Sequence, residues 1–306
     1  MTQAERRDPY WDNLKGILIF FVVFGHFLWD ADIGPGIIHA AVSFIYMFHM
    51  PAFAFVSGRF GHGRAESAGS IVRFFLLFIL LDVAMIAMWP AGSVLVPRAH
   101  AWYLLALCVW RLLTKRVHRF NWFPVACAVT AIAMGFVSDG GDILAVSRII
   151  GFWPFYSLGY STSEQDTHAL AGRRRWLTCF GVGCVAVLLF AVMYIAYCPY
   201  MSDLILRPYQ DIRGHWFRSG SYIFAACMLI CVIAAAPRRR VRFLTDIGRY
   251  SLGIYVFHRP LAYLFLMLPE GVPPFVIIAL SLACAIILCA AFGNRFIHKL
   301  IHRLIS

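Results

Sequence analysis

Two ionisable residues lie in the apolar stretch from Trp11 to Asp30, Lys15 at one end and His26 deep inside it. Eleven residues of helix, at about 1.5 Å per residue, separate them by roughly 16 Å, about half of a bilayer's hydrocarbon core. We therefore expect Lys15 at a membrane edge and His26 well inside. An imidazole at that depth is costly unless it faces protein or a water-filled cavity, so His26 is a candidate functional residue.

Asp30 follows His26 by four residues, which places the two side chains on the same helical face. The carboxylate can accept a hydrogen bond from one ring nitrogen of His26 and so fix its tautomer. The alternative is a packed polar histidine beside a solvated aspartate, and the residue types alone do not separate the two.

The composition predicts an integral membrane protein. Of 306 residues, 61% are hydrophobic and 14% are charged. A chain of this composition has more apolar surface than one soluble core can bury. The first apolar run lacks a small-residue cleavage site, so we expect a retained span rather than a signal peptide. Nine cysteines lie in or beside apolar runs without a CxxC pair, so we expect core residues and no metal site.

Ten apolar runs have roughly the length of a membrane span. They cover residues 13–29, 37–57, 70–90, 100–113, 121–137, 143–161, 175–198, 217–236, 248–268 and 272–296. Their connections are short and no internal repeat appears, which argues against the inverted repeats of many transporters. The predicted fold is an all-α bundle of about ten transmembrane helices in a single domain, residues 1–306.

Basic residues are concentrated in alternate connections between these runs. The net charge is +12, and 21 of the 27 lysines and arginines fall in segments on the same side as the two termini. The positive-inside rule then places both termini in the cytoplasm. This distribution indicates membrane topology and gives no reason to expect a nucleic-acid partner.

The second run ends in the sequence FIYMFHMPAFAFVSGRF, which contains His49, Pro51 and the pair Ser57-Gly58. Proline frees a backbone carbonyl inside a span, and glycine allows close approach of another chain or a ligand. A kinked packing helix is the alternative interpretation.

Further ionisable residues recur at similar depth: Asp82, Arg148, His258 and Arg259. Because an unpaired charge in lipid costs several kcal/mol, we expect a polar layer buried among the helices. For the two arginines and Asp82 we favour a structural role, in which Asp82 pairs with Arg259 or Arg148.

Four stretches, in order, resemble the acyltransferase-3 family of bacterial membrane acyltransferases, particularly the stand-alone sugar O-acetylase type. They are Lys15 to His26, Phe53 to Gly58, Ala101 to Leu105 and Ile247 to His258. The departure lies at Ser70-Ile71-Val72-Arg73, where the family often has two arginines three residues apart and this chain has Arg73 alone.

The resemblance implies a multi-pass protein of the bacterial inner membrane that transfers an acyl group, most often acetyl from acetyl-CoA. The acceptor is a hydroxyl of a cell-surface glycan, glycolipid or lipid-linked sugar, modified directly because no fused esterase-like domain is expected. His26 would act as general base or as a transient acyl carrier, with Asp30 orienting it. The resemblance assigns the remaining site residues as follows: for CoA binding, Lys15, Ser57, Gly58, Arg59, Arg64 and Arg73; for acceptor binding, His49, Trp102, Tyr103, Arg148 and His258.

Two other functional classes remain open at this stage. One is a transporter or flippase in which the buried polar layer relays protons or binds substrate. The other is a membrane scaffold without a ligand. Acetyl-CoA hydrolysis or transfer by the purified protein would distinguish an enzyme from a transporter and from a scaffold. The sequence does not specify the oligomeric state.

Overall fold

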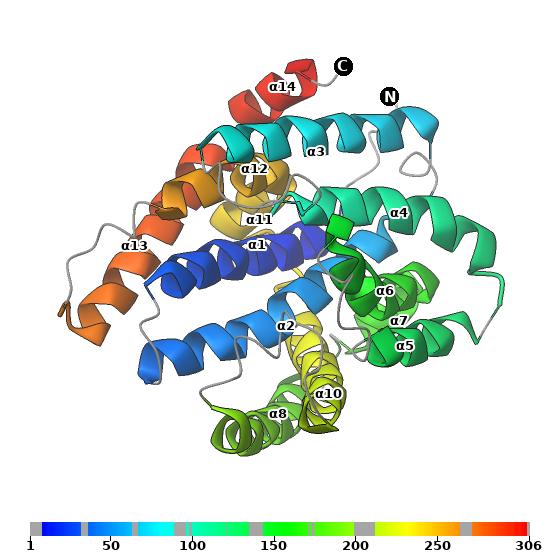
Figure 1. Cartoon of the computed structure of the whole chain (residues 1–306), viewed down its shortest axis with the longest axis vertical. Helices are drawn as coiled ribbons and strands as arrows, with labels where there is room; N and C mark the ends of the chain where they lie inside the picture. The colour runs from blue at the N-terminus through cyan, green and yellow to red at the C-terminus, as the bar shows by residue number, and fades with distance from the viewer. Residues whose placement is uncertain are drawn as a thin grey trace.

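Helices account for all of the regular structure in the part of the chain that the computed structural model describes (Figure 1). The described residues are 8–31, 36–62, 67–88, 96–97, 100–120, 122–134, 143–170, 172, 175–198, 212–263 and 271–304. The helices are α1 (Pro9–Asp30), α2 (Ile37–Arg59), α3 (Ala68–Met88), α4 (Trp102–Val117), α5 (Phe123–Ala133), α6 (Val146–Ser161), α7 (Glu164–Leu170), α8 (Arg175–Tyr197), α10 (Ile212–Ala235), α11 (Arg242–Arg249), α12 (Ser251–Ala262), α13 (Pro274–Phe292) and α14 (Arg295–Leu304), with a 3-10 turn, η3, at Ile143–Ala145. The predicted all-α class is confirmed.

Each of the ten predicted runs contains helix, but the number of spanning helices is not confirmed. Within the described parts of the chain, six helices are long and apolar enough to cross a membrane: α1, α2, α3, α8, α10 and α13. The helices α4, α5, α6 and α12 have 16, 11, 16 and 12 residues. At 1.5 Å per residue these cover about 16–24 Å, which is less than a hydrocarbon core of about 30 Å.

The predicted ninth run was expected as one helix over residues 248–268. Two helices occupy its start instead, because α11 ends at Arg249 and α12 begins at Ser251, with Tyr250 as a common cap in a non-helical conformation (φ −111°, ψ 23°). The polar sequence of α11, RFLTDIGR, makes it an amphipathic helix rather than part of a span.

The first helix, α1, forms the centre of the molecule. Pro9 occupies its first turn, and the Asp8 carboxylate caps it by accepting a hydrogen bond from the Tyr10 amide at 2.9 Å. It packs against α2, α11, α12 and α13 (Figure 1). Thirteen of its 22 residues are buried, so side chains on several faces of this helix point into protein.

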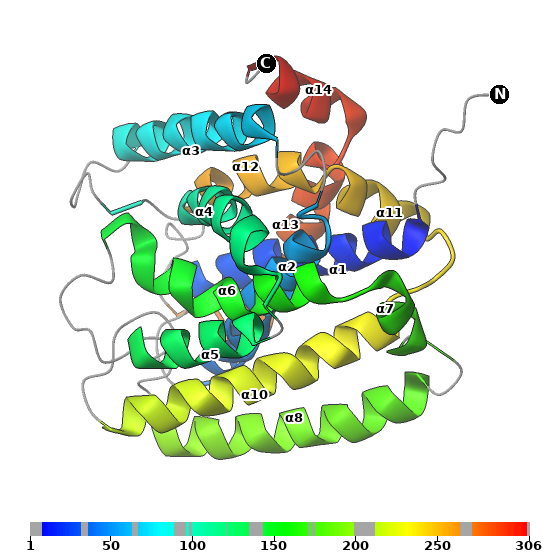
Figure 2. The same cartoon turned by 90° about the vertical axis from the view of Figure 1, so that its right-hand side faces the viewer.

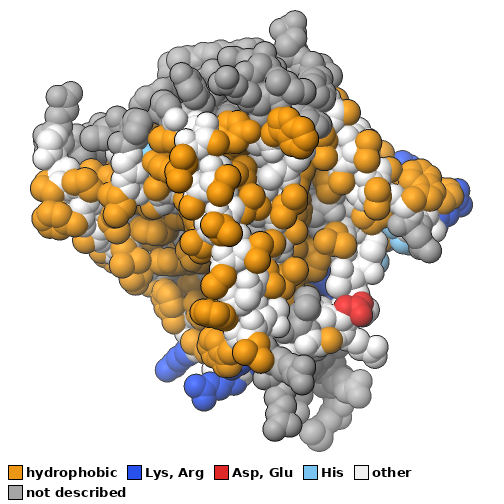
Figure 3. All heavy atoms as spheres, turned by 90° about the horizontal axis from the view of Figure 1, so that it is seen from below, with side chains coloured by type: hydrophobic (Ala, Val, Ile, Leu, Met, Phe, Trp, Pro, Cys, Tyr) orange, Lys and Arg blue, Asp and Glu red, His pale blue; other side chains and the backbone are white. Residues whose placement is uncertain are grey.

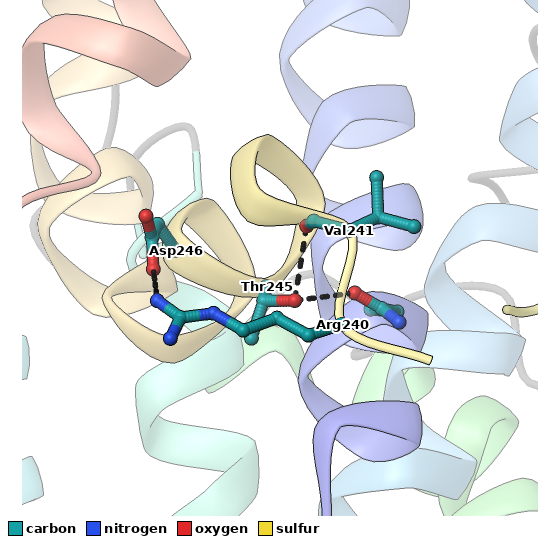
Figure 4. Close-up of polar contacts among 5 residues, drawn as sticks. Arg240, Val241, Thr245 and Asp246 are labelled. Carbon is teal, nitrogen blue, oxygen red and sulfur yellow. Dashed lines mark hydrogen bonds and ion pairs between the residues drawn. The ribbon is translucent and has the colours of Figure 1, made fainter. Parts of the chain in front are cut away.

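Polar contacts and glycines join α11 closely to α1 (Figure 4). Thr245 donates a hydrogen bond to the side-chain oxygen of Asn13 at 2.7 Å. The Asn13 amide nitrogen donates to the Pro237 and Arg239 carbonyls, each at 2.8 Å. A Cβ atom on Gly248 would overlap the main chain of α1, so the two backbones touch here. This contact fixes the end of α11 beside the first turns of α1.

The surface seen from below α8 and α10 is covered largely by hydrophobic side chains (Figure 3). These two helices pack side by side at the edge of the molecule (Figures 1 and 2). On α8, Phe180 is 75% exposed and Ile195 is 83% exposed. Single exposed apolar residues are ordinary in soluble proteins, but a continuous apolar face around long apolar helices indicates contact with lipid. The chain is therefore an integral membrane protein.

Candidate active site

Four histidines from separate segments form a cluster beside the C-terminal half of α1. His26 (α1) lies 5.1 Å from His258 (α12) and 6.4 Å from His49 (α2), measured between ring centroids, and His100 lies 4.8 Å from His258. Three of them are buried, with exposed fractions of 3% or less, whereas His26 is partly exposed. Among the described residues no group of three or more His, Cys, Asp or Glu side chains is arranged to hold a metal ion. His26 is thus the member of this cluster that a small molecule can reach.

The partner of His26 is a tyrosine from the neighbouring helix. The Tyr46 hydroxyl lies 2.7 Å from Nδ1 of His26, and the Tyr46 ring stacks on Trp29 with centroids 4.7 Å apart. When His26 carries its proton on Nδ1, the phenol oxygen accepts it and Nε2 presents a lone pair. In that tautomer Tyr46 holds the ring and Nε2 is available to accept a proton.

Asp30 has a partner other than the one expected. Its carboxylate accepts a hydrogen bond from Arg259 at 2.6 Å, and both side chains are nearly buried, with exposed fractions of 4% and 10%. The role of holding the His26 ring, expected of Asp30, passes to Tyr46, because the carboxylate is directed to the guanidinium. Arg259, for which we expected Asp82 as the partner, forms this ion pair with Asp30 instead.

The two neighbouring histidines have defined tautomers. Nδ1 of His49 donates to the Ile45 carbonyl and Nδ1 of His258 donates to the Tyr255 carbonyl, both at 2.7 Å. In neutral rings the Nε2 atoms are then acceptors. Nε2 of His258 is buried without a hydrogen-bond partner among the described residues, so a ligand that enters beside His26 would meet this acceptor.

A pocket of about 200 Å³ opens at the Lys15 end of α1. Its lining comes from α1, α2, α3, α4, α11 and α12: Lys15, Phe53, Val56, Ser57, Phe60, Phe74, Tyr103, Leu104, Leu107, Arg111, Gly248, Arg249, Ser251, Leu252 and Tyr255. Nζ of Lys15 lies 3.8 Å from the centroid of the Phe60 ring, and the Ser57 and Tyr103 hydroxyls are 2.8 Å apart. We call this cavity the donor pocket, after the acyl donor that the sequence resemblance leads us to expect. It combines cationic groups with aromatic walls.

The predicted CoA-binding residues divide into two groups. Lys15 and Ser57 line the donor pocket. Gly58 packs against α6 instead, because a Cβ atom there would overlap the Tyr156 carbonyl. The Arg59 guanidinium lies 5.6 Å from the Trp11 ring centroid, and Arg73 is exposed on α3. Neither arginine is part of the lining, and Arg64 lies outside the described residues.

Two arginines in the lining, Arg111 and Arg249, were not assigned to the site from the sequence. Arg111 is 9% exposed, lies 4.3 Å from the Phe74 ring centroid and donates to the Ser70 hydroxyl at 3.4 Å. A sequence signal existed for it: Arg111 follows Leu104 by seven residues and Leu107 by four, and these residues share one helical face. Arg249 directly precedes the non-helical Tyr250 and is positioned by the contact between α11 and α1.

Aromatic contacts connect the donor pocket to the histidine cluster. Tyr255 lines the pocket, and its ring centroid is 5.7 Å from that of His258 and 5.0 Å from that of His100. Its hydroxyl donates to the His100 carbonyl. His258 in turn neighbours His26, so two side chains, Tyr255 and His258, connect the pocket to the candidate catalytic histidine.

A second, smaller pocket lies on the other side of Tyr46, between α2, α6 and α10. It measures about 70 Å³ and contains Arg148, one of the predicted acceptor-binding residues. Trp102 lies near it, because its ring stacks on Phe152 of the lining at 5.5 Å and lies 5.8 Å from the Arg148 guanidinium. Tyr103, which was expected with this group, belongs to the donor pocket.

Comparison with known proteins gives a family match over nearly the whole chain. A family model described as an acyltransferase domain matches residues 8–294. The chain belongs to the acyltransferase-3 family. The nodulation protein NolL of Sinorhizobium fredii (strain NBRC 101917 / NGR234) is 27% identical over 215 residues, which are 60% of this chain and 58% of NolL. No solved structure matches.

Membership of the acyltransferase-3 family fits the convergence seen in the structure. All four stretches that carry the resemblance contribute to the donor pocket: Lys15, the segment from Phe53 to Ser57, Tyr103 with Leu104, and residues 248–255. These segments are far apart in the sequence and share this one cavity. An acyltransferase that has to hold an acyl donor beside a base would require such an arrangement.

Proposed function

We propose that this protein is a membrane O-acyltransferase that moves an acetyl group from acetyl-CoA to a hydroxyl of a cell-surface glycan, glycolipid or lipid-linked sugar. The observation that carries the proposal is the donor pocket, which joins residues from the four family stretches to three cationic side chains and adjoins the histidine cluster. The family match supports acyl transfer, and the acetyl group and the acceptor class are the proposed specifics.

The donor pocket suits the shape and charge of an acyl-CoA. Lys15, Arg111 and Arg249 supply positive charge for the phosphates. Aromatic side chains, including Tyr103 and Tyr255, line the wall toward His258, where the uncharged pantetheine arm and its thioester would lie. At about 200 Å³ the pocket takes the arm, while the nucleotide end remains at the basic rim.

His26 is the proposed general base. Nε2 removes the proton from the acceptor hydroxyl while the hydroxyl oxygen attacks the thioester carbonyl carbon. The carbon–sulfur bond then breaks, and the imidazolium returns the proton to the departing CoA thiolate. Throughout these steps the Tyr46 oxygen accepts a hydrogen bond from Nδ1–H of His26, which stabilises the imidazolium and keeps the ring oriented. The overall reaction converts acyl-CoA and an alcohol into an ester and the CoA thiol, with no net change in charge.

The protein's proposed place is the bacterial inner membrane, with both termini in the cytoplasm. Basic residues occur in the last turns of α2, α4 and α11. Two of them lie near the start of α1, because the Arg59 guanidinium is 5.6 Å from the Trp11 ring centroid and Arg249 lines the donor pocket together with Lys15. This supports a donor pocket that opens to the cytoplasm, where acyl-CoA is made.

The test is His26→Ala in purified protein, with His118→Ala as the control because His118 is also a helix-end histidine but is exposed and outside both pockets. Without the base we expect transfer to fall by about a hundred- to ten-thousand-fold. CoA should still raise the unfolding temperature, since a ligand at 100 times its Kd stabilises by about 2.7 kcal/mol.

Retained transfer in a folded His26→Ala protein would contradict the base role. Absence of any CoA-dependent stabilisation in the wild type, together with pH-driven uptake of a solute, would instead favour the transporter class. Incubation of the wild type with labelled acetyl-CoA and no acceptor separates a base from an acyl carrier, because an acyl carrier would leave label on His26.

A further inference from the structure

The pocket on the far side of Tyr46 has the chemistry of an anion site. Its lining is Tyr46, Met47 and Pro51 from α2; Ser147, Arg148, Gly151 and Phe152 from α6; and Arg218, Ser221, Tyr222 and Ala225 from α10. Two arginines face the same small space, and the described lining contains no carboxylate. Arginine in such pairs recognises phosphate or carboxylate oxygens through its planar array of N–H donors.

Ser147 provides an independent indication of a ligand. It lies in the first turn of α6, is 8% exposed, and its Oγ atom is buried without a hydrogen-bond partner among the described residues. A buried hydroxyl without a partner is uncommon, and a ligand or water is the usual explanation. The first turn of a helix also presents backbone N–H groups and the positive end of its dipole, so this end of α6 favours an anion.

The backbone before Ser147 has an unusual conformation. Leu144 and Ala145 have φ angles of 51° and 54°, in the left-handed region that residues with a Cβ rarely adopt. This pair turns the chain directly into α6 and sets the position of Ser147 and Arg148. Tyr222 then ties α10 to α6 by donating to the Gly151 carbonyl at 2.7 Å, which holds Arg218 on the opposite wall.

The pocket is adjacent to the catalytic histidine but separate from the donor pocket. Tyr46 lines it and at the same time contacts Nδ1 of His26. No residue is common to the two linings, and along α2 the nearest lining residues, Pro51 and Phe53, are two positions apart and so point to different faces of the helix. The volume of about 70 Å³ exceeds the roughly 10–15 Å³ that one water needs and is too small for a whole sugar chain.

We propose that this pocket binds an anionic group of the acyl acceptor, a phosphate or a carboxylate, and so places a neighbouring sugar hydroxyl at His26. The inference rests on the proposed function and narrows the acceptor to negatively charged glycans or sugar-lipids. The anion is held by Arg148 and Arg218 with Ser147, and Tyr46 separates it from the reacting atoms. No covalent change occurs at the anion itself.

The experiment uses membranes that contain the full chain, labelled acetyl-CoA, and anion-exchange chromatography of the labelled product. We expect the product to bind the exchanger. Repeating the chromatography at about pH 2 then distinguishes the two sources of charge, because a carboxyl group is largely protonated and neutral there, whereas a phosphate ester keeps a negative charge. A neutral product, with acetyl transfer and CoA-dependent stabilisation both present, would overturn this inference and leave the proposed function standing. Absence of any labelled product and of CoA stabilisation would overturn both.

Substitution of the two arginines, with the acceptor KM as the measured quantity, gives a second test. With Arg148→Gln or Arg218→Gln we expect the apparent KM for an acceptor-rich membrane extract to rise about ten-fold or more, with the KM for acetyl-CoA unchanged. Arg218→Lys, which retains the charge, should recover part of the loss. Arg242→Gln, an exposed arginine on α11 outside both pockets, is the matched control. An unchanged acceptor KM in folded, CoA-binding Arg148→Gln and Arg218→Gln proteins would overturn the proposal.

Discussion

At the scale of single residues, the chemistry of His26 depends on the atom that holds its other nitrogen. A carboxylate in that place would be a strong acceptor of the Nδ1 proton, whereas the Tyr46 phenol is a weaker acceptor that can also donate. The Asp30 carboxylate is occupied by Arg259, so its charge is neutralised close to the site instead of being delivered to the imidazole. The proposed base is therefore oriented by a neutral group that also lines the proposed anion pocket.

Tyr46→Phe tests this arrangement, because it keeps the ring and removes the hydroxyl. Hydrogen bonds to charged groups contribute about 1.5–3 kcal/mol, so we expect kcat to fall by about ten- to a hundred-fold while the KM for acetyl-CoA is unchanged. The control is Tyr10→Phe, which removes an equally buried hydroxyl that donates to the Ile233 carbonyl at 2.8 Å outside both pockets. If both variants lose activity only in proportion to folded yield, Tyr46 has a structural role alone.

At the scale of elements, the sequence predicted which segments are helical and which residues lie at similar depth. The separation of Lys15 and His26 follows directly from the helical rise, and both occur on α1 as expected. Two features could not be predicted. The break at Tyr250 was missed because the apolar run continues past it, and the closeness of α1 to α11 depends on glycines whose partner helix is not encoded locally.

Gly248→Ala tests that contact. A Cβ atom at this position would overlap the Asp12 carbonyl oxygen and lie 2.6 Å from the Gly16 amide nitrogen, so α1 and α11 have to separate. Overpacking of this kind costs about 1–3 kcal/mol, and we expect a lower unfolding temperature and weaker binding of acetyl-CoA, since Gly248 also lines the donor pocket.

Gly181→Ala on α8 is the matched control for this variant. An added Cβ atom there meets nothing within 4 Å, and alanine is favoured over glycine in a helix by about 1 kcal/mol. We expect an unchanged or higher unfolding temperature. Equal losses in the two glycine variants would show that the close approach of α11 to α1 has no special importance.

At the scale of the whole molecule, the apolar exterior encloses a polar layer whose pairing the sequence could not specify. Asp82, Arg148 and Arg259 were recognisable as ionisable groups at bilayer depth, whereas Asp30 was expected to contact His26. Which acid meets which base depends on the packing of α1 against α12, and that packing brings Asp30 to Arg259 across 229 positions of the chain. Residue type and depth predict a buried polar layer, whereas the partners follow from tertiary structure.

The ion pair between Arg259 and Asp30 should be a major contributor to stability. Removal of one member leaves the other charge buried and unpaired, which typically costs about 3–5 kcal/mol, so Arg259→Gln should greatly reduce folded yield. The double variant Asp30→Asn/Arg259→Gln should recover part of the lost yield.

The comparison pair is Arg240 and Asp246, which are 3.2 Å apart and 62% and 39% exposed (Figure 4). Here Arg240→Gln should change stability by at most about 1 kcal/mol. Equal effects at the two pairs would contradict a buried, unscreened interaction.

Lys15 of the donor pocket lies near the end of α1 that we propose to be cytoplasmic, whereas the second pocket adjoins His26, eleven residues further along α1, through Tyr46. We therefore expect donor and acceptor to reach the site from opposite sides of the membrane. Sealed vesicles test this because acetyl-CoA does not cross a bilayer. Inverted inner-membrane vesicles should transfer label from external acetyl-CoA, whereas right-side-out vesicles should do so only after permeabilisation with detergent.

A protease-sensitive tag added after Ser306 gives the orientation independently, since a cytoplasmic C-terminus is cleaved from outside in the inverted vesicles alone. Transfer in sealed right-side-out vesicles would place the donor pocket on the outer face and contradict the orientation derived from the basic residues.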